Sequence, residues 1–133
     1  MPGCVLRAAG VDFPVDEFLV KSTLTACVVY HKGDPKGSRG RVYEESGINI
    51  IVSEASGDDL AQQILDALDF LEWNKEELIR LQSYLGGEVL QLDFGVWQKD
   101  DFGHFCYFPP NLLQAAAALG LGIVLSVYIN QEK

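Results

Sequence analysis

The stretch CVLRAAGVDFPVDEFLVKSTLTACVVY, residues 4–30, decides the fold, because a second stretch of the chain repeats its plan. In both stretches an apolar strand leads to a Phe-Pro corner, a short helix and a second strand that closes on a tyrosine. The second stretch is HFCYFPPNLLQAAAALGLGIVLSVY, residues 104–128, where Phe108-Pro109 takes the place of Phe13-Pro14. This duplication predicts two βαβ units.

The segment between the two stretches predicts two further strands and a helical pair. Apolar and polar residues alternate over residues 48–52 and 90–96, which is typical of strands with one buried face. Leucines and isoleucines at spacings of three and four predict helical structure from about residue 57 to 85, either two consecutive helices or one helix bent at Asn74. The order is then βαββα(α)ββαβ. We expect an α+β fold, ferredoxin-like or a duplicated split βαβ sheet, with the helices packed on one face.

Composition and charge limit the classes of protein to which the chain can belong. With 133 residues, 48% hydrophobic and 22% charged, the chain matches one globular domain over residues 1–133. Its net charge of -9 repels nucleic-acid backbones and anionic membranes, so we expect neither as a partner. The three cysteines include no Cys-x-x-Cys pair, and no segment reaches the ~20 apolar residues of a membrane span. We therefore predict reduced thiols and a cytoplasmic location.

The loop HKGDPKGSRGR, residues 31–41, concentrates positive charge. It holds four basic residues and one acid, which leaves six basic and eighteen acidic residues elsewhere. Three interpretations remain open: a solvated hairpin-like loop, a docking site for an acidic partner, or a phosphate site formed by glycine amides. The loop lacks the Gly-Lys-Ser/Thr ending of a P-loop. Its candidate binding residues are His31, Lys32, Lys36, Arg39 and Arg41.

Two smaller groups of residues are also candidates. His104 and Cys106 share one face of the predicted strand over residues 104–108, as a metal site or a nucleophile with its base would require. Tetrahedral zinc needs four ligands, however, and the other histidine, His31, is remote in sequence. We therefore predict no metal, no cofactor and no catalytic residue. Trp97 falls on the polar side of its strand and, with Phe102, is a candidate interface.

Short motifs along the chain support a family resemblance. They are Phe-Pro-x-Asp at residues 13–16, Lys-Gly-Asp-Pro at 32–35, Ser-Gly-Ile at 46–48, Phe-Leu at 70–71, Leu-Gly-Leu-Gly at 119–122 and Leu-Ser-Val-Tyr at 125–128. Together they resemble a bacterial family of small free-standing proteins of the DUF4279 type, a domain of unknown function. The motifs are turns and core positions, so the resemblance implies a fold and no catalytic residues. Some such families resemble immunity proteins that neutralise a partner toxin.

The leading hypothesis is a non-enzymatic protein-interaction module, with an immunity-type inhibitor as its most specific form. An unidentified protein partner would dock on the loop or on the acidic residues of the helical pair, which are Asp58, Asp59, Asp66, Asp69, Glu72, Glu76 and Glu77. The alternatives are a binding domain for a small anionic ligand and an enzyme that uses His104 with Cys106. Ile51, on an otherwise polar strand face, also predicts a homodimer.

Overall fold

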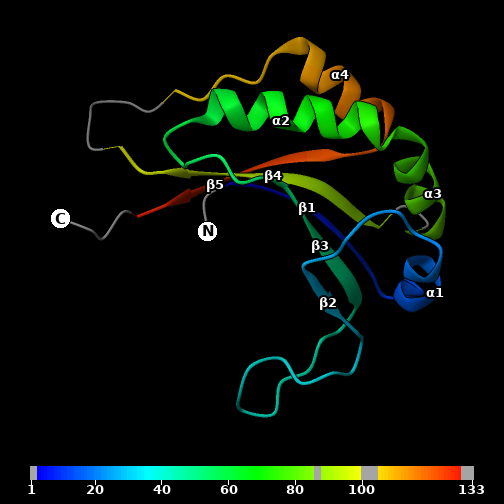
Figure 1. Ribbon diagram of the computed structural model, residues 1–133. Helices are drawn as coiled ribbons and strands as arrows, with labels where there is room; N and C mark the ends of the chain where they lie inside the picture. The colour runs from blue at the N-terminus through cyan, green and yellow to red at the C-terminus, as the bar shows by residue number, and fades with distance from the viewer. Residues whose placement is uncertain (1–2, 86–87, 100–104, 130–133) are drawn as a thin grey trace.

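The described residues, 3–85, 88–99 and 105–129 of a computed structural model, form one five-stranded sheet and four helices (Figure 1). The strands are β1 (Gly3–Gly10), β2 (Val28–Tyr30), β3 (Ser46–Ser53), β4 (Val89–Trp97) and β5 (Gly122–Tyr128). The helices are α1 (Val15–Val20), α2 (Leu60–Trp73), α3 (Lys75–Leu85) and α4 (Pro110–Ala118). The predicted α+β class is confirmed.

The strand order is β2-β3-β1-β4-β5. β1 is antiparallel to β3 and β4, β2 is antiparallel to β3, and β5 is parallel to β4. Two crossovers each enclose one strand: β3 lies between β1 and β2, and β1 lies between β3 and β4. This is the arrangement of a split βαβ unit, here present twice. A third crossover through α4 adds β5 at the edge.

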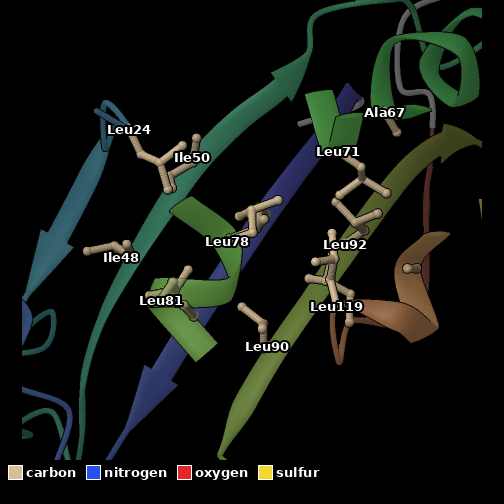
Figure 2. Close-up of a cluster of buried hydrophobic side chains, with 14 of the residues drawn as sticks. Leu24, Ile48, Ile50, Ala67, Leu71, Leu78, Leu81, Leu90, Leu92 and Leu119 are labelled. Atoms are coloured by element: carbon tan, nitrogen blue, oxygen red, sulfur yellow. The ribbon is translucent and has the colours of Figure 1, made fainter. Parts of the chain in front are cut away.

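The helices cover one face of the sheet (Figure 1). Alternate strand residues, such as Leu6, Ile48 and Leu92, are fully buried against them because strand side chains alternate between the two faces. Figure 2 shows this core, with labelled side chains from the strands, the loop before β2, the helices and the residue after α4: Leu24, Ile48, Ile50, Ala67, Leu71, Leu78, Leu81, Leu90, Leu92 and Leu119. The opposite face of the sheet carries no helix among the described residues.

The prediction of a strand over residues 104–108 is wrong for residues 105–108, the part of it that the structure describes. Residues 105–109 form a connection without strand pairing. Because β5 runs parallel to β4, the chain needs a crossover connection between the end of β4 and the start of β5. Residues 105–109 belong to that connection. Phe108 lies against Phe94, with ring centroids 5.2 Å apart. The predicted duplication therefore holds for the corner, the helix and the closing strand of the second unit.

The helical pair follows the prediction with one shift at its start. α2 begins at Leu60 rather than near residue 57, because Asp59 is its N-cap and accepts a hydrogen bond from the Gln62 amide at 3.1 Å. Before the helix, Ser56 Oγ accepts a hydrogen bond from the Asp58 amide at 3.0 Å. Of the two predicted alternatives, the structure has two consecutive helices, α2 and α3, separated at Asn74. Among the described residues, no helix has the length and apolar character needed to cross a membrane.

Candidate functional site

The segment between β2 and β3, residues 31–45, folds into an ordered hairpin that we call the basic hairpin. It projects from the sheet on the side away from α2 and α4 (Figure 1). Backbone hydrogen bonds join Gly33 to Tyr43 at 2.8 Å and Lys36 to Arg41 at 2.9 Å. At the tip, Arg39 has a φ of 73°, in the left-handed region. The predicted hairpin-like loop is confirmed, with a defined backbone.

An aromatic stack fastens the basic hairpin to the uncovered face of the sheet. The Tyr43 ring stacks on the Tyr30 ring, with centroids 4.4 Å apart and planes inclined by 23°. Lys36 Nζ lies 5.6 Å from the centroid of the Tyr43 ring. Beneath the stack, Tyr30 covers Gly47 of β3, where a Cβ atom would lie 2.8 Å from the Ala8 carbonyl oxygen. Only glycine leaves room for this packing.

His31 joins the base of the basic hairpin to α1. Its Nε2 lies 2.9 Å from Asp16 Oδ1, and its Nδ1 lies 3.2 Å from Asp34 Oδ2. These two hydrogen bonds to carboxylates raise the pKa of His31 above its usual value. The imidazole, proposed from the sequence as a ligand-binding group, therefore holds two parts of the chain together.

A cavity of about 670 Å³ lies along the basic hairpin. Lys36 and Arg41 bring two cations to it, and Tyr30 brings a phenol whose pKa is raised by burial and by the nearby Glu45 carboxylate. The complete lining is Val11, Tyr30, Lys36, Arg41, Val42, Tyr43, Glu44 and Glu45. The cavity therefore combines charge of both signs with the surface of two aromatic rings.

The cations of the basic hairpin have no ionic partner within the described part of the molecule. No described carboxylate oxygen lies within 4.0 Å of the charged nitrogens of Lys32, Lys36, Arg39 or Arg41. The Lys32 backbone is engaged, since its amide donates to Ser46 Oγ at 2.9 Å. The structure thus brings Lys36 and Arg41 to one cavity and leaves Arg39 exposed at the tip.

A row of polar side chains crosses the uncovered face of the sheet, and sequence reasoning missed it. Arg7 Nε lies 3.2 Å from Asp93 Oδ2, and Ser126 donates to Asp93 Oδ1 at 2.6 Å. With its amide oriented to suit its neighbours, Asn49 accepts from Arg7 Nη1 at 3.0 Å. The row therefore satisfies its own charges, and it differs in this respect from the basic hairpin.

The remaining candidates lie apart from the basic hairpin. Trp97 pairs with Tyr128 in the sheet, with ring centroids 6.5 Å apart, whereas Phe102 lies outside the described residues. His104 also lies outside them, so its geometry with the half-buried Cys106 is not described. No group of three potential metal ligands occurs among residues 3–85, 88–99 and 105–129. Burial raises the pKa of the Cys4 thiol and keeps it neutral.

The acidic residues of the helical pair are largely used inside the molecule. Asp59 caps α2, Asp66 accepts from Ser53 at 2.6 Å, and Glu77 pairs with Arg80 at 2.8 Å. Asp58 pairs with Lys99 at 3.1 Å. This face consequently offers fewer free charges than the sequence pattern indicated.

Comparison with known proteins identifies the family without a function. The family model described as Domain of unknown function (DUF4279) matches residues 3–130. Comparisons with curated proteins and with solved structures each gave no match.

Proposed function

The chain belongs to the DUF4279 family, whose description gives no function, and we propose that it is a non-enzymatic module that docks an acidic segment of a partner protein on the basic hairpin. The observation that carries the proposal is the set of hairpin cations without a carboxylate partner in the described residues. On a chain of net charge -9, the hairpin gathers four cations, beside the carboxylates of Asp34, Glu44 and Glu45. Such a site attracts an acidic partner and orients it.

Preorganisation of the basic hairpin supports docking. The Tyr30–Tyr43 stack and the His31 contacts fix the hairpin before a partner arrives, so less conformational entropy is lost on binding. Arg41 supplies a planar guanidinium that binds a carboxylate through two hydrogen bonds, and Lys36 supplies a second charge. Tyrosine beside arginine is a common composition at the centre of protein interfaces.

The acidic residues of the helical pair form a weaker docking surface than the basic hairpin, because several of their charges already have partners within the fold. Asp59, Asp66 and Glu77 already hold partners within the fold. A basic partner would have to compete with those contacts. The hairpin cations form no such ion pair among the described residues, although Glu44 and Glu45 line the same pocket as Lys36 and Arg41.

Affinity capture from the source lysate tests the proposal. Three baits are compared: the wild type, the hairpin variant Lys36→Glu/Arg41→Glu, and a control variant Lys21→Glu/Lys75→Glu with the same change in net charge. Lys21 and Lys75 are exposed and lie outside the hairpin. We expect one protein to bind the wild type and the control, to be lost from the hairpin variant, and to elute with rising salt. Equal retention by all three baits contradicts the proposal.

The cavity favours a small anionic ligand as a second candidate function, because two aromatic rings and two cations line one half-open pocket, together with Glu44 and Glu45. Thermal-shift screening with nucleotides, sugar phosphates and carboxylates distinguishes the two functions. A ligand at a hundred times its dissociation constant adds about 2.7 kcal/mol to the free energy of unfolding. We expect the hairpin variant to lose that shift and the control variant to keep it. Absence of any stabilising compound counts against this candidate.

A further inference from the structure

The edge strand β5 carries no charged side chain. β5, Gly122–Tyr128, has the sequence GIVLSVY and is the last strand of the sheet in the described residues. Edge strands are ordinarily protected by lysine, proline, a bulge or a short length. β5 has seven residues, contains neither charge nor proline, and pairs with β4 in unbroken register. It lacks all of these protections.

One hydrogen bond next to the β4–β5 pairing shows in which direction the backbone groups of β5 point. The Gln98 amide donates to the Tyr128 carbonyl at 2.7 Å, so the backbone groups of Tyr128 point towards β4. Backbone groups alternate in direction along a parallel strand. Ile123, Leu125 and Val127 therefore direct their N–H and C=O groups away from β4, towards the free edge.

Apolar side chains accompany this edge. Leu125 is 37% exposed and Val127 is 51% exposed, although both lie on the face that the helices cover elsewhere. Ile129, the next residue of this parity, is 67% exposed. An apolar strip thus runs beside these outward backbone groups, which have no partner among the described residues.

We propose that β5 pairs with β5 of a second copy of this chain, antiparallel about a twofold axis at Leu125, to form a continuous ten-stranded sheet. A second copy fits because pairing centred on Leu125, the middle residue, uses the full strand and places Ile123 opposite Val127 of the other copy. About six hydrogen bonds then form between the copies. The uncharged edge also offers a place where two molecules of net charge -9 can meet without apposing charges within the strands. This proposal is independent of the function proposed for the basic hairpin.

Sedimentation equilibrium of the wild type and of Leu125→Pro tests the pairing. Proline at 125 removes an outward donor and leaves the β4 ladder intact, which edge strands tolerate. We expect a dimer whose dissociation constant rises about ten- to hundredfold in the variant, since two central hydrogen bonds are lost. A monomeric wild type at the highest soluble concentration overturns the proposal, as does an unchanged dimer in the variant. If Leu125→Pro does not fold, Val127→Lys replaces it with the same expectation.

Disulfide trapping tests the register. In a background with Cys27→Ser and Cys106→Ser, Leu125→Cys places two thiols opposite each other at a Cα separation of about 5.5 Å, within disulfide range. Ile51→Cys is the matched control, because Ile51 is 46% exposed on the uncovered face of the sheet. We expect covalent dimer from Leu125→Cys and little from Ile51→Cys. The reverse result places the contact on the uncovered face and overturns the proposal.

Discussion

At one edge of the sheet, β2 has three residues and continues into a hairpin with four cations, whereas at the other edge β5 has seven residues and no charge. The short strand and its charged hairpin prevent uncontrolled pairing at the first edge. At the second edge, the outward backbone groups of β5 have no partner among the described residues. The difference is the basis of the two contacts that we propose: charged side chains that recognise a partner at β2, and a backbone that pairs with a like strand at β5.

Substitution of one glycine near each edge gives the largest expected difference. Gly47→Ala places a methyl group against the Ala8 carbonyl and the Tyr30 ring, whereas a Cβ at Gly122 meets no atom within 4 Å. We expect Gly47→Ala to lower the free energy of unfolding by about 1–3 kcal/mol through overpacking. Gly122→Ala should change it by less than about 1 kcal/mol, in the stabilising direction. Urea unfolding measures both values, and equal losses would show that the stack does not depend on Gly47.

The aromatic pairs at the two edges should differ in coupling energy. Tyr30 and Tyr43 stack at 4.4 Å, whereas Trp97 and Tyr128 meet edge-on at 6.5 Å. A double-mutant cycle with Tyr30→Leu and Tyr43→Leu should give a coupling of about 0.5–1.5 kcal/mol. The corresponding cycle at Trp97 and Tyr128 should give less, because the rings are near the outer limit of interaction. A coupling near zero at the first pair would mean that the stack does not hold the hairpin.

The smallest expected effect is the pH dependence of the His31 contacts. The pKa of His31 is raised in the folded protein, so the protonated imidazole is bound more favourably there than in the unfolded chain. The stabilisation is complete below a pH of about 6.5 and is lost as the pH rises through the folded-state pKa. Melting curves of the wild type and of His31→Gln should therefore converge at alkaline pH. A difference in melting temperature between the two proteins that does not change with pH would indicate that the His31 contacts do not depend on the charge of the imidazole.

Local patterns were sufficient to predict most elements of the fold. Alternation gave the strands around Ile48 and Leu92, and the leucine spacing gave the helices and their break at Asn74. The apolar residues 105–108 were misread because composition does not distinguish a strand from an apolar connection, and the deciding fact is the parallel pairing of β5 with β4.

The candidate site could be predicted only in part, because its geometry depends on strand register. The sequence located the hairpin and its cations, but not the lining residues Tyr30, Tyr43, Glu44 and Glu45. The two tyrosines flank the loop at its two ends, and that symmetry was an available signal for a pair across the hairpin. The contact of Arg7 with Asp93 joins residues 86 positions apart, and no local pattern predicts it.

Hydrogen exchange of the captured complex against the free protein tests the central claim most directly. The claim is that a partner docks on the basic hairpin, residues 31–45, and the amides of that segment should then exchange more slowly in the complex, together with those of β2 beside it. The account predicts little change in α2 and α3. Unchanged exchange in the hairpin, with slower exchange confined to the acidic helices or to β5, would contradict it.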